Sequence, residues 1–213
     1  IGENQTAIYY NSNKLRNYDA VLPRIGASQT SYGTAIVRQF EMMGNYVVNK
    51  SDAIIASRDK LRSLQILAKY GIDMPITGYA SHTMDIHDVI EKVGKTPLIM
   101  KLLQGTQGNG MVLAETMKAA ESVMNAFKQV DADILVQEFI KESAGTDIRA
   151  FVVGNQVVAS MKRIATNGSF KSNVHQGGKA VSINLDKEEE KLVLKAVEIL
   201  GLSIAGVDFM RSN

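Results

Sequence analysis

One segment of the sequence combines a lysine with a glycine-rich stretch. Lys101 ends an apolar run, three glycines follow within six residues, and a second apolar run begins at Met111. The glycines are Gly105, Gly108 and Gly110. Glycines let backbone N–H groups approach an anion closely, and a lysine places a positive charge beside them. The segment is therefore suited to hold the phosphates of a nucleotide, whereas the alternative is a β-hairpin turn beside an exposed lysine.

The spacing of these residues excludes three common kinds of phosphate loop. A P-loop needs a glycine where Val89 stands, relative to the tripeptide Gly94-Lys95-Thr96. A protein kinase has its lysine after the glycine loop and carries a His-Arg-Asp motif, which this sequence lacks. A dinucleotide-binding loop opens a helix, but here a strand-like pattern follows. The sequence therefore predicts a strand, a glycine loop and a second strand that cover a nucleotide.

Later residues could complete such a site. Glu138 and Phe139 end an apolar strand, whose edge can offer backbone groups to an adenine while apolar side chains sandwich the ring. Asp147 follows a flexible Ser-Ala-Gly and is suited to accept hydrogen bonds from ribose hydroxyls. A core strand and a solvated loop aspartate are the competing interpretations.

Charged residues on the last apolar segments suggest a metal and phosphate chemistry. Asp208 lies on an apolar strand, where a carboxylate needs a cation or hydrogen bonds, and Mg²⁺ would supply the cation. A structural salt bridge with Arg211 is the alternative. Arg149 and Arg163 lie on a predicted hairpin, where guanidinium groups could reach phosphate or carboxylate oxygens, or could simply be surface arginines.

Apolar periodicity predicts the elements that position these residues. The first part of the chain alternates, with a strand over 20–25, a helix over 34–43, a strand over 46–48 and one long helix over 51–71. The later part predicts a strand over 134–140, a hairpin of 148–153 with 156–161, a helix over 187–200 and a strand over 204–209. We therefore expect an α/β or α+β protein with more than one lobe.

Composition narrows the function classes. The chain has 213 residues, enough for one large domain or two to three lobes, and its 24 basic and 22 acidic residues give a net charge of +2. This balance argues against a dedicated nucleic-acid surface or a polybasic membrane patch. Because the sequence has no cysteine, it has no disulfides or thiolate metal sites. No signal peptide or bilayer-spanning run is recognisable, so we expect a cytoplasmic protein with no direct nucleic-acid or membrane partner.

With these residues in place, the sequence resembles the ATP-grasp ligases and, within them, the RimK family of ribosomal-protein glutamate ligases. The resemblance runs from about Tyr9 onward and rests on ordered segments at 23–26, 32–34, 38–41, 57–63, 101–110, 136–140, 145–149, 170–173 and 205–208. It implies an ATP-grasp fold that holds the nucleotide between two lobes. Residues 1–53 would be the remnant of an N-terminal α/β pre-ATP-grasp domain, 54–137 the central lobe with the glycine loop, and 138–213 an incomplete C-terminal lobe.

The resemblance also implies roles for single residues. Nucleotide contacts are expected from Lys101, Gly105, Gly108, Gly110, Glu138, Phe139, Asp147, Lys171, Ser172 and Asn173. Asp208 would be the first ligand of Mg²⁺ or Mn²⁺, and Arg149 and Arg163 would be catalytic arginines that stabilise the phosphoryl group or an acyl phosphate. Arg24 would contact a substrate carboxylate.

The chemistry implied by the family is an ATP-dependent ligation of a carboxylate to an amine. ATP phosphorylates the carboxylate, the amino group of glutamate attacks the acyl phosphate, and ADP and phosphate leave. The expected partners are ATP, glutamate and the C-terminal tail of a small-subunit ribosomal protein, and the expected assembly is a homo-oligomer, a tetramer by resemblance. A related ligase with a small-molecule acceptor and a non-catalytic nucleotide-binding module stay open as alternatives.

The end of the sequence departs from the family pattern. The family continues after its last strand into a Glu-x-Asn motif that completes the metal site, whereas this sequence ends at Asn213, five residues after Asp208. We therefore expect the chain as given to bind a metal–nucleotide complex poorly and to lack full activity. Truncation of an active enzyme is the simplest explanation, and the start at Ile1 likewise suggests missing upstream sequence.

Overall fold

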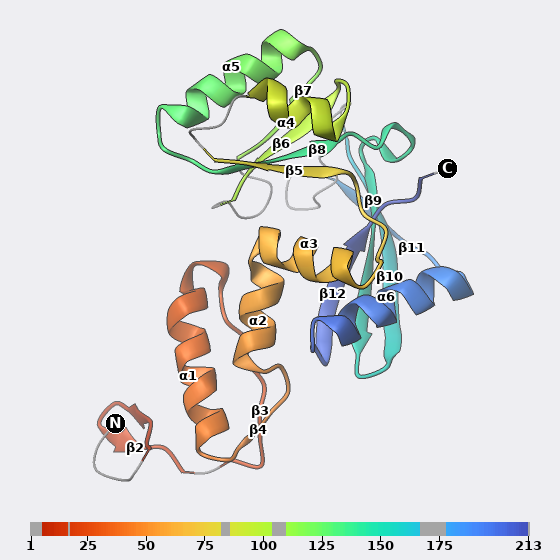
Figure 1. Ribbon diagram of the computed structural model, residues 1–213. Helices are drawn as coiled ribbons and strands as arrows, with labels where there is room; N and C mark the ends of the chain where they lie inside the picture. Colours follow the sequence, from red (N-terminus) through yellow and green to blue (C-terminus); the bar gives the residue numbers. More distant parts are fainter. Residues whose placement is uncertain (1–5, 17, 82–85, 104–109, 167–177, 213) are drawn as a thin grey trace.

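The computed structural model describes residues 6–16, 18–81, 86–103, 110–166 and 178–212 (Figure 1). An N-terminal group of short strands and helices precedes a central lobe and a C-terminal lobe, each built on its own four-stranded sheet. Gly105, Gly108 and residues 171–173, all predicted to contact the nucleotide, lie outside the described residues. No helix within the described ranges combines the length and the apolar character needed to cross a bilayer.

The N-terminal group is small and is held together by helix α1. Its elements are β1 (Tyr9–Tyr10), β2 (Asn13–Lys14), β3 (Ala20–Val21), η1 (Ala27–Gln29), α1 (Thr30–Met42), β4 (Tyr46–Val47) and α2 (Ser51–Arg58). β3 and β4 pair in parallel, and Val37 and Phe40 of α1 form a core with Val47 of β4. β3 is shorter than the predicted strand over 20–25 because Pro23 has no N–H to donate and restricts the residue before it.

The prediction of one long helix over 51–71 was wrong, because the helix is broken at Asp59. α2 ends at Arg58, and α3 (Lys60–Lys69) begins directly afterwards in a different direction (Figure 1). Asp59 has extended backbone angles, φ −79° and ψ 108°, and its carboxylate accepts a hydrogen bond from the N–H of Arg62 at 3.0 Å. One residue thus ends the first helix and caps the second.

The central lobe is an antiparallel sheet covered on one face by two helices (Figure 1). Its elements are β5 (Thr77–Ala80), α4 (Ile86–Val93), β6 (Leu98–Leu102), β7 (Met111–Ala114), α5 (Met117–Lys128) and β8 (Ile134–Glu138), with the strand order β5-β8-β6-β7. The core lies between the sheet and these helices. Gly78 lets α4 pack directly on β5, since a Cβ there would come within 2.8 Å of Val89 and Val93.

The C-terminal lobe contains the predicted hairpin and one covering helix. Its elements are η2 (Lys141–Ser143), β9 (Thr146–Val153), β10 (Gln156–Ile164), β11 (Lys179–Ser182), α6 (Lys187–Ile199) and β12 (Ile204–Phe209), with the strand order β11-β10-β9-β12. Ala150 and Val152 of β9 pack against Val193 and Val197 of α6. Because side chains alternate along a strand, the residues between them project from the opposite face of the sheet.

Candidate functional site

Lys101 is a partly buried cation on β6 whose hydrogen-bond partner is neutral. Its ammonium donates to the side-chain oxygen of Gln137 on β8, and the Gln137 amide donates to the Thr77 hydroxyl at 2.7 Å. This chain of hydrogen bonds crosses the sheet from β6 through β8 to β5. Burial lowers the pKa of Lys101 below its usual 10.5, and the nearby charge of Lys60 lowers it further.

Lys60 was not among the residues predicted from the sequence, yet it reaches the same end of β6. Its ammonium donates to the carbonyl oxygens of Leu102 at 2.7 Å and Leu103 at 3.2 Å, and burial lowers its pKa. An ammonium has three N–H donors. Within the described residues, Lys101 uses one of its donors and Lys60 uses two. The remaining donors and two positive charges are therefore available to an anion at this point.

The start of β7 requires a glycine for two independent reasons. Gly110 has φ +74°, and a Cβ on it would lie 2.7 Å from the Leu102 side chain. Its carbonyl oxygen accepts a hydrogen bond from the Leu102 N–H at 2.8 Å, which closes the β6–β7 hairpin. Gly110 thus brings the second strand of the predicted strand–loop–strand cover back beside Lys101.

Glu138 ends β8 and ties it to the segment before β5. Its carboxylate accepts a hydrogen bond from the Ile76 N–H at 2.7 Å, and its own N–H donates to the Ile76 carbonyl oxygen at 3.0 Å. Phe139 follows it, partly buried, where the chain leaves the central sheet for the C-terminal lobe. One oxygen of the Glu138 carboxylate and the Glu138 N–H are therefore engaged with the backbone of Ile76.

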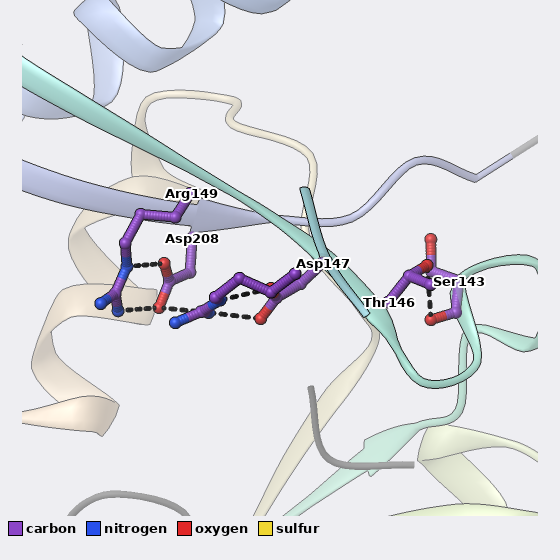
Figure 2. Close-up of polar contacts among 6 residues, drawn as sticks. Ser143, Thr146, Asp147, Arg149 and Asp208 are labelled. Carbon is purple, nitrogen blue, oxygen red and sulfur yellow. Dashed lines mark hydrogen bonds and ion pairs between the residues drawn. The ribbon is translucent and has the colours of Figure 1, made fainter. Parts of the chain in front are cut away.

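Four charged residues form one network on the face of the C-terminal sheet opposite α6 (Figure 2). Asp147 and Arg149 lie two residues apart on β9, so they share a face of the sheet. The register places Arg163 of β10 opposite Asp147, and Asp208 of β12 opposite Arg149. Strand pairing alone thus brings together four residues that the sequence predicted separately as ribose, catalytic and metal contacts.

The network consists of two bidentate ion pairs, and one further contact between Arg163 and Asp208 links them. Arg149 donates to both oxygens of Asp208 at 2.7 Å, Arg163 donates to both oxygens of Asp147, and Arg163 also lies 3.1 Å from Asp208. Arg163 is 5% exposed, whereas the side chains of Arg149 and Asp208 are 42% and 43% exposed. Burial opposes the charge of Arg163, but the hydrogen bonds and charges of Asp147 and Asp208 outweigh it and raise its pKa.

The carboxylates of this network differ in the hydrogen-bonding capacity that they retain. A carboxylate has about four lone-pair sites. Arg163 uses two of those on Asp147, which leaves two for hydroxyl donors. Three contacts from Arg149 and Arg163 converge on Asp208. A further cation at Asp208 would therefore have to share this carboxylate with the arginines.

Asp208 does not pair with Arg211, the alternative partner considered from the sequence. Arg211 instead donates to Glu189 near the start of α6 at 2.5 and 2.9 Å, and its carbonyl oxygen accepts a hydrogen bond from the buried Ser143 hydroxyl at 2.6 Å. The salt bridge of that alternative does form, but with Arg149 and Arg163, because Arg211 pairs with Glu189 of α6 instead. Among the described residues, no group of three or more His, Cys, Asp or Glu side chains could hold a metal ion.

Arg24 lies on a different segment of the chain from both groups. It is exposed on the loop between β3 and η1, and in the described part of the chain no hydrogen bond or ion pair involves its side chain. No hydrogen bond or ion pair among the described residues joins the lysines of the central lobe to the arginine and aspartate network. The candidate site thus consists of two charged groups on different sheets, and β8 leads from one sheet to the other (Figure 1).

This chain is similar in sequence to known ligases. The sequence profile of the RimK-like ATP-grasp domain matches residues 57–213, and that of the RimK pre-ATP-grasp domain matches residues 1–54. A probable alpha-L-glutamate ligase of Methanococcoides burtonii is 58% identical and one of Picosynechococcus sp. is 56% identical. Each match covers 100% of this chain and 71% of the relative.

A solved structure of similar shape is that of the ATP-grasp ligase PsnB in complex with a minimal precursor, Mg and ADP. It superposes with a TM-score of 0.71 at 18% identity, and the match covers 100% of this chain and 70% of PsnB. The predicted ATP-grasp fold is confirmed by this likeness and by the family match. The chain therefore belongs to the RimK-like ATP-grasp family, whose members are ligases that form carbon–nitrogen bonds.

Proposed function

We propose that this protein adds glutamate to the C-terminal carboxylate of a small-subunit ribosomal protein at the expense of ATP. A carboxylate oxygen of the acceptor would take the γ-phosphoryl group, which gives an acyl phosphate and ADP. The amino group of glutamate would then attack the acyl carbon, lose a proton and displace phosphate. The names of the glutamate ligases more than half identical to this chain support the choice of amino acid.

The observation that carries the proposal is the pair of lysines at the end of β6. Lys60 and Lys101 have lowered pKa values because they are partly buried, and neither has a carboxylate partner within the described residues. Cations held in this way are preorganised for an anion, which gains more from them than from hydrated lysines. We assign Lys101 and Lys60 to the phosphates of ATP, beneath the strand and glycine cover that includes Gly110.

The adenosine would lie along the segment that connects the two sheets. In this proposal, the backbone at Glu138 and Phe139 contacts the adenine, and the free lone pairs of Asp147 accept hydrogen bonds from the ribose hydroxyls. Asp147 is suited to this task because Arg163 fixes its orientation through two hydrogen bonds. Gly105, Gly108, Lys171, Ser172 and Asn173 would add contacts from outside the described residues.

A divalent metal fits this site at one position. Asp208 is a hard oxygen ligand and is still 43% exposed, and Mg²⁺ is commonly bound through one or two carboxylates together with substrate phosphates. Bound there, Mg²⁺ or Mn²⁺ would neutralise phosphate charge. Arg149, the more exposed arginine of the network, is the one that can turn from Asp208 toward a phosphoryl or acyl-phosphate oxygen. Arg163 would hold the two carboxylates in place.

The acceptor can be identified by mass spectrometry. The full-length protein is incubated with ATP, Mg²⁺, glutamate and the ribosomal protein, and the expected result is a ladder of glutamate-residue mass increments with ADP release. A matched acceptor whose C-terminal carboxylate is amidated should gain no mass. Glutamate addition to a small molecule alone would support the related amino-acid ligase instead. ATP binding without ADP formation on any acceptor would support a non-catalytic module.

A further inference from the structure

Arg58, the last residue of α2, holds the loop that carries Arg24 through hydrogen bonds. The Arg58 guanidinium donates to the carbonyl oxygen of Ile25 at 2.5 Å, to that of Gly26 at 3.2 Å and to the Thr30 hydroxyl at 2.7 Å. These three acceptors lie more than 25 residues earlier in the sequence and span the turn from the loop into α1. A planar guanidinium with several fixed donors is suited to hold such a turn in one conformation.

A second contact fixes the same loop against α1. A Cβ on Gly33 would lie 2.5 Å from the Ile25 side chain, so Ile25 packs into the space that this glycine leaves on the helix surface. Ile25 is therefore anchored through its side chain by α1 and through its carbonyl oxygen by Arg58. Arg24 precedes this anchor directly, and its own guanidinium stays exposed.

The surroundings of Arg24 suit a polypeptide more than a small molecule. Leu22 and Tyr32, on the same loop and on the first turn of α1, are 57% and 69% exposed. An exposed guanidinium on a segment that also exposes apolar side chains offers a carboxylate contact together with apolar contact area. A peptide tail ending in a carboxylate can use both kinds of contact, whereas free glutamate is too polar to use the second.

The break at Asp59 connects this loop to the nucleotide end of the protein. Arg58 and Lys60 lie on either side of Asp59, and they reach different segments: Arg58 holds the loop of Arg24, and Lys60 contacts Leu102 and Leu103 at the end of β6. The side chain of Asp59 caps α3 and so keeps the break in place. A turn of three residues thus sets where the Arg24 loop stands relative to the proposed phosphate site.

We propose that Arg58 is a positioning residue for the acceptor: it holds the loop of Arg24 so that a peptide C-terminal carboxylate is presented to the phosphates. This role rests on the proposed function, because it concerns the acceptor of the same ligation. Arg58 itself touches backbone and Thr30 rather than substrate. Its loss should therefore weaken use of the acceptor and leave the handling of ATP unchanged.

The test compares Arg58→Gln, Arg58→Lys and Thr30→Val in the full-length protein, with Arg62→Gln as the matched control. Arg62 is an exposed arginine on α3 whose side chain makes no hydrogen bond or ion pair in the described structure. The expected result for Arg58→Gln is an increase of about tenfold in KM for the acceptor, because hydrogen bonds from a charged donor are lost. The kcat, the KM for glutamate and the Kd for ATP should stay within about twofold of the wild type.

Two milder variants separate positioning from a general loss of structure. Arg58→Lys keeps the charge but loses the planar fork, so it should restore part of the acceptor KM, and Thr30→Val should raise that KM by a smaller factor. Hydrogen exchange of the backbone amides over residues 22–29 gives a readout that needs no turnover. Exchange there should accelerate in Arg58→Gln and stay unchanged in Arg62→Gln.

Different outcomes overturn the two proposals. If the wild type adds glutamate but Arg58→Gln has the acceptor KM of Arg62→Gln, Arg58 does not position the acceptor. An equal rise in the Kd for ATP, or unchanged hydrogen exchange over residues 22–29, also overturns the positioning role. If the wild type modifies no acceptor, the proposed function fails, while the exchange data still show whether Arg58 orders the loop.

Discussion

The central lobe and the C-terminal lobe hold their buried cations in different ways. Within the described residues, Lys101 of the central lobe and Lys60 of α3, which reaches the same strand end, donate only to neutral oxygens of carbonyl and amide groups. On the C-terminal sheet, two arginines are matched by the carboxylates of Asp147 and Asp208, so the formal charges of this network sum to zero. One lobe therefore presents uncompensated positive charge, and the other presents a neutral network.

The pKa directions agree with this difference. Burial lowers the pKa of both lysines, which means that the fold disfavours their charged forms. Burial acts in the same direction on Arg163, but the neighbouring carboxylates reverse the effect and raise its pKa. An anion that binds at the lysines relieves an unfavourable state, whereas one that binds at the arginines competes with existing partners. We therefore propose that phosphate binds at the lysines, whereas an arginine must give up an existing partner before it contacts a phosphate.

Replacing Lys101 with Met should have the largest effect on activity and little effect on stability. Loss of one preorganised cation at a phosphate commonly costs about 100- to 1,000-fold in rate, so ADP formation should fall by about that factor. The free energy of unfolding should change by less than about 1 kcal/mol, because removing a poorly compensated charge offsets the lost hydrogen bond to Gln137. Urea unfolding and an ADP assay measure both quantities.

The matched control is Lys118→Met, which replaces an exposed lysine on α5. It should change neither the rate of ADP formation nor the free energy of unfolding. A large loss of stability in Lys101→Met with normal ADP formation would mean that the lysine is structural. The proposed difference between the lysines and the paired arginines would then be wrong.

Arg163→Gln should show the reverse pattern, with a clear loss of stability. It leaves Asp147 and Asp208 without their buried cation, and removing one partner of a buried pair costs about 3 kcal/mol or more. Because both carboxylates keep some solvent contact, we expect about 3 kcal/mol by urea unfolding. Lys162→Gln, the preceding residue on β10, is the control. A stability equal to this control would contradict the assignment of Arg163 as the centre of the network.

The sequence selected the members of the charged network but not their pairing. Asp208 was selected as a carboxylate on an apolar strand, Arg149 and Arg163 as arginines on a hairpin, and Asp147 as an aspartate after a flexible segment. The structure brings all four into one network. Their mutual pairing was not predicted, because it depends on the register of three strands that are distant in the sequence. A one-residue shift in that register would have placed them on the opposite face.

Local patterns also explain which features of the fold were missed. Apolar spacing continued through Asp59, so it predicted one helix, although aspartate is one of the residue types favoured at an N-cap, the position that Asp59 takes. That signal could have located the break and drawn attention to Lys60. The contact of Lys60 with Leu102 spans 42 residues and has no local signature. The predicted domain boundaries at 53/54 and 137/138 stay predictions.

Arg149→Gln should show that the two arginines of the network have different roles, one in activity and one in stability. Its pair with Asp208 is over 40% exposed on both sides, so its loss should cost less than about 1 kcal/mol of stability. Activity should nevertheless fall by about tenfold or more if Arg149 turns to the phosphoryl group. A double-mutant cycle with Asp208→Asn should give a coupling energy for folding below about 1 kcal/mol. A coupling as large as the effect of Arg163→Gln would show that both arginines are structural.

The smallest expected effect is a dependence of stability on alkaline pH that comes from Lys101. Because the pKa of Lys101 in the fold lies below 10.5, the folded protein loses this proton before the unfolded chain does. Between the lowered pKa and 10.5 the unfolded state binds more protons, so the Lys101 contribution to stability rises with pH, while affinity for ATP falls as the charge disappears. The pKa of Lys60, the charged neighbour of Lys101, is also lowered.

The difference in unfolding free energy between wild type and Lys101→Met, measured at several pH values up to 10.5, isolates the contribution of Lys101. A difference that stays constant over this range would mean that Lys101 is as well solvated as an ordinary surface lysine, and that the two lobes do not differ in the way their cations are held.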